Sequence, residues 1–391
     1  MRIAFCHNYY QQSGGEDQVF HAESSMMEEQ GHDVLRYTRH YDEINDLSKL
    51  TLMKKTFWNK EVYKELASTF NEFKPDVVHF TNTFPLISPA AYKAAHGVGA
   101  AVIQSLHNFR LICPGSLLLR NGRNCEYCVG KTFAWPAIWN RCYRNNFFAT
   151  AVTAGANSWH RLRGTHQKYV NRFIALTNFS RQKFVEGGLD AKRIVVKQNF
   201  SSSTSSGKTE SRNGRALFVG RLSPEKGIDV LLDCWNRIDS QIGLDIVGEG
   251  PMQSQLASAT RNMANVRLLG KLENDKVKEL MERATVQIVP SNAYETFGIV
   301  VVEAFGAGTP VIASDHGSLA ELIEHEKTGL KFEPGNANDL KTQIMRLVRD
   351  AELQSSISEN VISEFKNKYT KEANYRLLQR IYQDAVEEVN Q

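Results

Sequence analysis

The alternation of short apolar runs with helical patterns constrains most strongly what this chain can fold into. The runs are rich in Val and Ile and are bounded by polar or Gly-containing turns. They lie at residues 2–6, 76–80, 100–106, 172–177, 193–197, 215–220, 242–248, 265–270, 285–291 and 310–315. Such runs are typical of parallel strands that helices cover on both faces. The sequence therefore predicts an α/β fold with parallel sheets.

A polar stretch at residues 201–214, rich in Ser and Gly, interrupts this pattern. The strands and helices restart after it, and residues 337–391 show helical patterns only. A chain of 391 residues is also too long for one ordinary core. We therefore predict an N-terminal domain at 1–200, a linker at 201–214, a second domain at 215–370 and a last helix at 371–391.

The positive charge of the chain is concentrated in one interval. The net charge is only +4, but ten Lys and Arg stand against one acid, Glu126, between His107 and Arg172. Three of the five Trp lie there too, at Trp135, Trp139 and Trp159. This composition suits an anionic partner such as membrane headgroups, a phosphorylated substrate or nucleic acid. An ordinary solvated loop region is the alternative.

The N-terminus predicts where the protein works. Met1 leads directly into an apolar strand, without the pattern of a signal peptide. No run approaches the ~18 uncharged apolar residues of a transmembrane helix. We expect a cytoplasmic protein whose membrane contact, if any, is peripheral.

Two charged residues follow the first strand after the polar stretch. "VGRLSPEKG" places Arg221 and Lys226 between that strand and the next helix. The N–H groups of a helix N-terminus, an Arg fork and a Lys ammonium together suit a diphosphate. Ordinary surface charges are the alternative.

Two glutamates stand eight positions apart in the apolar run "SNAYETFGIVVVEAFGAGTPVIASD". Glu295 precedes Thr296, Phe297 and Gly298 at an expected helix start, and Glu303 lies beyond it. Eight residues along a helix span ~12 Å, so both could contact one elongated ligand. Alternatively, they are a helix-start acid and a surface acid. A carboxylate in so apolar a stretch needs a partner, which favours ligand binding.

This pattern resembles the retaining glycosyltransferases of family 4. The likeness rests on the two glutamates, on "VGRLSPEKG" before them and on "GTPVIASDHGSLAELI" after them, and it extends over nearly the whole chain. The resemblance implies the GT-B fold: two Rossmann-like domains that face each other across a cleft, with a last helix that returns to the N-terminal domain. It implies transfer of a sugar from a UDP or GDP donor to a saccharide or polyprenyl-diphosphate-linked acceptor, in cell-surface polysaccharide synthesis such as that of lipopolysaccharide or capsule.

The resemblance also implies a role for each candidate residue. Glu295, with the backbone at Thr296, Phe297 and Gly298, would hold the donor sugar, and Glu303 would hold the ribose. Arg221 and Lys226 would bind the diphosphate, and Gly14 and Gly15 would let the backbone approach the phosphates. His107 would contact the donor sugar from the other domain. Neither an enzyme nucleophile nor a catalytic metal is expected. Many relatives have His-Asp where this chain has His107 and Asn108, which leaves the role of Asn108 open.

Four cysteines, Cys113, Cys125, Cys128 and Cys142, cluster in the basic interval. They could form a structural zinc site, although the outer spacings are irregular. Reduced cysteines packed as small apolar residues are the alternative. The run resembles an insertion, at about 108–160, of family-4 enzymes in bacterial surface-polysaccharide synthesis. It would lie on the acceptor side, where its Arg and Trp would suit a lipid diphosphate.

Three other functions remain open. "GEGPMQ" at residues 248–253 offers part of a dinucleotide-binding pattern but lacks its third Gly. A nucleic-acid binder would use the basic interval, but no known recognition motif accompanies it, so no nucleic-acid partner is predicted. A catalytically inactive nucleotide-sugar sensor would share the fold.

Overall fold

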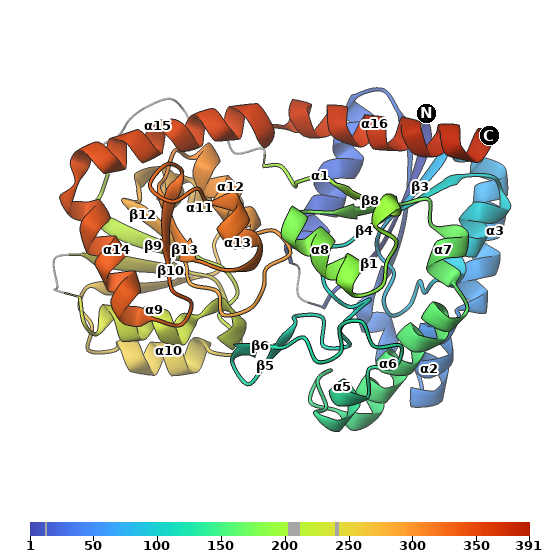
Figure 1. Ribbon diagram of the computed structural model, residues 1–391, viewed down its shortest axis with the longest axis horizontal. Coiled ribbons are helices and arrows are strands. Elements are labelled where there is room, and N and C mark those ends of the chain that lie inside the picture. Colours follow the sequence, from blue (N-terminus) through green and yellow to red (C-terminus); the bar gives the residue numbers. More distant parts are fainter. Residues whose placement is uncertain (12–13, 202–211, 239–241) are drawn as a thin grey trace. The chain divides into compact units, whose positions relative to one another are not determined.

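The computed structural model describes residues 1–11, 14–201, 212–238 and 242–391 (Figure 1). The chain divides into two compact units. Unit 1 comprises Met1–Leu118, Glu126–Gln198 and Asn374–Gln391, and unit 2 comprises Leu119–Cys125 and Asn199–Ala373. Most of the predicted linker at 201–214 lies outside the described residues.

Unit 1 is built on a six-stranded parallel sheet of order β2-β1-β3-β4-β7-β8. Its strands are β1 (Arg2–Tyr9), β2 (Asp33–His40), β3 (Val77–Asn82), β4 (Ala101–Ser105), β7 (Arg172–Ala175) and β8 (Ile194–Val196). Every residue of β3 and β4 is buried. This burial on both faces explains their continuous apolar runs.

The helices of unit 1 begin at polar capping residues in several places. Asn59 caps α3 and Asn146 caps α6, and each side chain accepts a backbone N–H bond of the first turn. The helices are α1 (Gly15–Glu29), α2 (Lys49–Phe57), α3 (Lys60–Phe73), α4 (Ala90–Gly97), α5 (Trp135–Trp139), α6 (Phe147–Leu162), α7 (Thr165–Tyr169), α8 (Asn178–Glu186) and α16 (Lys371–Asn390). No helix of the described residues is long and apolar enough to cross a bilayer.

The C-terminal helix α16 packs into unit 1 beside the N-terminal elements (Figure 1). A buried polar network fastens it. Lys197 Nζ donates to Glu23 Oε1 (2.6 Å) and to Asn374 Oδ1 (3.2 Å). His79 Nδ1 lies 2.7 Å from the Tyr382 hydroxyl. Because Lys197 and Glu23 are each only 1 % exposed, their charges depend on each other.

Unit 2 holds a second parallel six-stranded sheet, of order β11-β10-β9-β12-β13-β14. Its strands are β9 (Arg215–Val219), β10 (Gly243–Val247), β11 (Val266–Gly270), β12 (Val286–Val289), β13 (Val311–Ser314) and β14 (Gly329–Phe332). This is the strand order of a Rossmann fold. The predicted parallel α/β architecture is confirmed.

Seven helices and one small hairpin complete the described part of unit 2. The helices are α9 (Ile228–Trp235), α10 (Gln253–Thr260), α11 (Asn274–Arg283), α12 (Ile299–Gly306), α13 (Gly317–Leu322), α14 (Ala337–Arg349) and α15 (Ala351–Lys368). The hairpin pairs β5 (Leu119–Arg120) with β6 (Arg123–Asn124). It comes from the cysteine-rich run, yet its contacts place it in unit 2.

Candidate active site

The predicted donor-binding residues of unit 2 gather where the strand order reverses. In this sheet β9 lies between β10 and β12, so the connection after β9 and the connection after β12 lead to opposite sides of the sheet. Open α/β sheets bind ligands at such switch points. Arg221 and Lys226 follow β9, and Glu295 follows β12. The fold thus brings residues 69 positions apart in the chain to one edge of the sheet.

Glu295 is held by two neighbours. Lys226 Nζ donates to its Oε1 at 2.6 Å, and Ser291 Oγ donates to the same oxygen at 2.7 Å. Burial favours the neutral acid, but the charge of Lys226 and the two hydrogen bonds outweigh it, so the pKa of Glu295 is lowered. The carboxylate is therefore ionised and fixed in direction before any ligand arrives.

A series of hydrogen bonds that the sequence did not reveal begins at the hairpin of β5 and β6. Asn124 Nδ2 donates to His316 Nδ1 (3.0 Å), and His316 Nε2 donates to the Ser291 carbonyl (2.8 Å). The pKa of His316 is lowered, chiefly by burial, so its ring is neutral at pH 7. The hairpin is thus connected to the residue that orients Glu295. No motif in the sequence pairs these distant positions.

Arg221 is the exposed cation of this edge. No hydrogen bond or ion pair engages its guanidinium within the described residues. Lys226, by contrast, already bonds Glu295. An unengaged guanidinium beside a helix N-terminus is suited to a bidentate bond with a phosphate.

The N-terminus of α12 lies where the sequence predicted it. Gly298 is its cap residue and has a φ of 107°, a conformation that favours glycine. Phe297 is only 2 % exposed, so its side chain belongs to the core and only its backbone can contact a ligand. The Thr296 carbonyl accepts a hydrogen bond from Ser318 Oγ (3.1 Å). Because Glu295 precedes the helix, the spacing of the two glutamates is not the helical one expected from the sequence.

Glu303 lies inside α12 and is partly buried. Its carboxylate has no hydrogen-bond or ion-pair partner among the described residues. Burial raises its pKa to about 7. A carboxylate so placed is costly for the folded chain unless a ligand satisfies it.

Several glycines let the loops of this edge approach closely. A Cβ at Gly227, which has a φ of +71°, would lie 1.8 Å from the Pro290 carbonyl oxygen. A Cβ at Gly248 would lie 1.9 Å from the oxygen of Gly220. Close packing against the loop that follows β9 therefore explains the glycines of "GEGPMQ". These glycines no longer need a dinucleotide-binding site to explain them.

The predicted residues of unit 1 lie at the carboxyl edge of its own sheet. Gly14 precedes α1, and its N–H donates to Asp17 Oδ2 (3.0 Å). A Cβ at Gly14 would meet nothing within 4 Å, so the surface above it is open to a ligand. His107 follows β4 and is partly exposed at its surface, but the burial of its ring lowers its pKa to about 3. It is a neutral group at any physiological pH.

Glu16, which no sequence pattern singled out, lies beside the predicted residues of unit 1. It accepts hydrogen bonds from the Tyr10 hydroxyl (3.0 Å) and from Asn108 Nδ2 (3.4 Å). Burial, despite these hydrogen bonds, raises its pKa to about 8. Asn108 thus has an observed role, which the family likeness left open. The position of Glu16 directly after Gly14 and Gly15 is visible in the sequence, but its burial is not.

A cavity of about 70 Å³ adjoins Glu16 and His107. Three buried polar atoms of its lining have no partner within the described residues: Thr81 Oγ1, His166 Nε2 and Arg110 Nε. Buried polar atoms are normally satisfied, so these indicate a polar ligand or ordered water.

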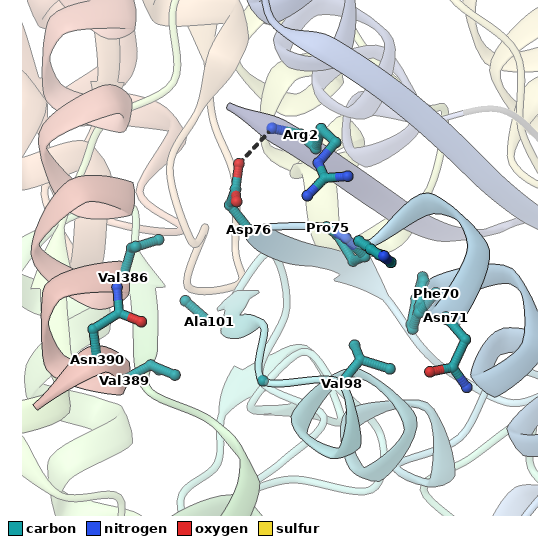
Figure 2. Close-up of a pocket in the computed structure, with 12 residues that line it drawn as sticks. Arg2, Phe70, Asn71, Pro75, Asp76, Val98, Ala101, Val386, Val389 and Asn390 are labelled. Atoms are coloured by element: carbon teal, nitrogen blue, oxygen red, sulfur yellow. Dashed lines mark hydrogen bonds between the residues drawn. The ribbon is translucent and has the colours of Figure 1, made fainter.

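A larger cavity, of about 370 Å³, lies at the opposite edge of the unit 1 sheet. Figure 2 shows Arg2, Asp76 and Val98 on one side and Val386 and Asn390 of α16 on the other. Arg2 N–H donates to Asp76 Oδ2 at 2.7 Å. This cavity is at the amino ends of the strands, away from the predicted residues, and we assign it no role in binding.

The four predicted zinc ligands are not gathered into a metal site. No three His, Cys, Asp or Glu side chains of the described residues are arranged to hold a metal ion. Cys128 and Cys142 pack in an apolar cluster with Ala134, Ala137 and Ala154. This packing fits small apolar residues better than thiolate ligands. The arrangement gives no support to a structural zinc site, and elemental analysis of the purified protein would test that prediction.

Comparison with known proteins agrees with this geometry. Residues 203–364 match the family described as glycosyl transferases group 1. The chain is 33 % identical over 327 residues to an uncharacterized glycosyltransferase of Methanocaldococcus jannaschii, covering 80 % of this chain and 86 % of the relative. It is 32 % identical over 197 residues to a phosphatidyl-myo-inositol mannosyltransferase of Mycobacterium leprae, covering 48 % of this chain and 52 % of the relative.

Solved structures share the fold over the whole chain. A protein of Anabaena crystallised with UDP superposes with a TM-score of 0.71 at 18 % identity, covering 97 % of this chain and 99 % of that one. The same protein has also been crystallised with UDP-glucose. At this identity the likeness shows the fold alone, which is GT-B as predicted. Together with the M. jannaschii relative, these findings show that the chain belongs to the group 1 glycosyltransferase family.

Proposed function

We propose that this glycosyltransferase moves a sugar from a nucleotide-diphosphate donor to a saccharide or lipid-linked acceptor with retention of configuration. The observation that carries the proposal is the edge of unit 2, where Glu295 is oriented by Lys226 and Arg221 is left unengaged. A cation without a protein partner beside an oriented carboxylate suits a ligand with phosphate at one end and hydroxyls at the other.

The donor would lie along this edge. Arg221 and Lys226 would bind the diphosphate, Glu295 the sugar hydroxyls and Glu303 the ribose. UDP is favoured over GDP because the Anabaena structural neighbour was crystallised with UDP and UDP-glucose. Carboxylates recognise vicinal hydroxyls through charge-assisted hydrogen bonds, which would supply the partner that Glu303 lacks.

In the proposed reaction, the bond between the anomeric carbon and the phosphate oxygen breaks, and its electron pair leaves with the diphosphate. The acceptor hydroxyl oxygen bonds to the same face of that carbon, and its proton passes to the departing phosphate. Charge develops on that phosphate, so fixed cations there stabilise the transition state. Arg221 and Lys226 would supply this charge, which gives the chain its own alternative to a catalytic metal.

The acceptor would enter unit 1. The cavity beside Glu16 is lined by three unpartnered polar atoms: the Thr81 hydroxyl oxygen, His166 Nε2 and Arg110 Nε. Such atoms could form hydrogen bonds with the hydroxyls of a saccharide. Thr81→Val should raise the acceptor KM about 5- to 30-fold, while leaving donor binding unchanged. An unchanged acceptor KM would leave ordered water as the occupant of the cavity.

A thermal-shift screen tests the donor class. UDP- or GDP-sugars should raise the Tm by ligand linkage, whereas NAD should not. The donor with the largest shift is then assayed with saccharide and polyprenyl-diphosphate-linked acceptors, and NMR of the product reports the anomeric configuration. Inversion would refute the retaining mechanism. Donor binding without transfer or slow hydrolysis would indicate a nucleotide-sugar sensor instead.

A further inference from the structure

Unit 1 exposes an unusual number of large apolar side chains in one segment. Trp139 is 82 % exposed, Trp135 59 %, Phe147 56 %, Phe133 48 % and Phe148 45 %. We call these five residues the aromatic segment. Single exposed apolar residues are common, but a concentration of aromatic side chains marks an interaction surface.

The local structure holds these side chains outward. The short helix α5 buries Pro136 and Ala137 against α6, within the apolar cluster that also contains Ala154. Trp135 and Trp139 are four residues apart, so they share the opposite side of α5. Their exposure is therefore imposed by the packing of α5.

The turn between α5 and α6 is also fixed. Thr150 Oγ1 donates to the Asn146 carbonyl (2.7 Å), and Tyr143 N–H donates back to Thr150 Oγ1 (3.0 Å). Asn146 Oδ1 accepts the N–H of Ala149 (2.9 Å), which caps α6. These hydrogen bonds hold the first turn of α6 in place, and Phe147 with it.

The charges around the aromatic segment are positive. Lys131, Arg141 and Arg144 are exposed and form no ion pair within the described residues. The sequence contains no acid between Glu126 and Glu186, and Lys183 bonds both of these (2.9 Å each). Residues 127–185 therefore contribute aromatic side chains and cations to this surface and no carboxylate of their own.

We propose that the aromatic segment and its cations bind the surface of an anionic phospholipid membrane. Trp side chains favour the headgroup region of a bilayer, and Lys and Arg are attracted to anionic lipids. Self-association through this surface would bring like charges together, which disfavours a second copy of the chain as its occupant. The inference is independent of the donor and of the transfer reaction.

Vesicle flotation tests this proposal. Full-length protein should float with vesicles of phosphatidylglycerol and phosphatidylcholine at 50 mM salt, and much less with phosphatidylcholine alone. The double substitution Trp135→Ser and Trp139→Ser should reduce the partition coefficient at least tenfold. Arg141→Gln and Arg144→Gln should each reduce it about fivefold.

Matched controls lie elsewhere on unit 1. Leu377→Ser removes an apolar side chain that is 46 % exposed on α16, and Lys60→Gln removes an exposed charge on α3. Neither should alter flotation. Circular dichroism and Tm of each variant establish that it folds.

Three outcomes would overturn the proposal: no flotation with anionic vesicles, flotation that the Trp substitutions leave unchanged, or concentration-dependent dimerisation that they abolish. Transfer to a water-soluble acceptor should be unaffected by Trp139→Ser. Membrane binding and transfer activity are thus measured separately, so the failure of one does not imply the failure of the other.

Discussion

Lys226 Nζ and Glu295 Oε1 lie 2.6 Å apart and join the loops that follow β9 and β12. The pair is partly exposed, at 31 % and 20 % for the two side chains. It fixes the direction of the carboxylate, and it uses part of the positive charge of Lys226. Arg221 is therefore the better candidate for the principal phosphate contact.

The two glutamates of the site should respond differently to the same substitution. Glu295→Gln should lower kcat about 10- to 100-fold with little change in nucleotide affinity, because it would contact the reacting sugar. Glu303→Gln should weaken UDP binding by a similar factor with a smaller effect on kcat at saturation. Steady-state kinetics and calorimetry measure the two effects. Equal losses in both variants, accompanied by unfolding, would indicate structural roles only.

Glu303 should also make stability depend on pH. Its pKa rises to about 7 in the folded chain, so folding favours the protonated acid. This contribution to stability is complete below the unfolded pKa of about 4.5 and is lost as the pH rises through 7. Glu303→Gln should therefore raise the free energy of unfolding by about 1 to 3 kcal/mol at pH 8.5 and change it little at pH 4.5. Urea denaturation without nucleotide at the two pH values tests this, and equal effects at both would contradict it.

The buried network around α16 should be sensitive to the loss of one charge. Lys197→Met leaves Glu23 buried without its cation and should cost about 3 to 5 kcal/mol of stability. The double variant with Glu23→Leu should recover part of this loss. Lys276→Met, which breaks an exposed pair with Glu279 (70 % and 43 % exposed), is the matched control and should have little effect. A loss no larger than that of the control would mean that the network does not fasten the helix.

Gly227→Ala should damage the donor site through the backbone. The substitution combines a positive φ with a Cβ 1.8 Å from the Pro290 oxygen, so the loop that carries Lys226 must move. We expect loss of several kcal/mol of stability and weaker UDP binding. Gly97→Ala, in α4 with open space around its Cβ, is the control and should be neutral or stabilising. Unchanged UDP affinity in Gly227→Ala would show that this loop does not bind the donor.

The sequence predicted the central strands because their apolar runs are continuous. It missed β2, whose polar and apolar residues mix because it lies at the sheet edge and is only partly buried. It also missed β14, an edge strand of unit 2, although three of its four residues are buried, because so short a run gives little periodicity. The edge strands β8 and β11 lie in predicted runs, so a position at the sheet edge does not by itself hide a strand.

The candidate residues beside turns were visible in the sequence, but their partners were not. Glu295 could be named because it stands in an apolar run beside a helix start. Its contact with Ser291 and the link from His316 to Asn124 depend on tertiary packing between distant segments. Glu16 was missed because its raised pKa results from burial, which single-sequence patterns do not give.

The contact between Asn124 and His316 bears on how such enzymes can be recombined. A chimaera that joins the N-terminal half of one relative to the C-terminal half of another, with the crossover at residues 201–214, would inherit the hairpin from one parent and His316 from the other. The orientation of Glu295 would then depend on a mismatched pair. Grafting residues 119–125 together with the C-terminal half keeps both members from one parent and offers a route to exchanging donor specificity as a unit.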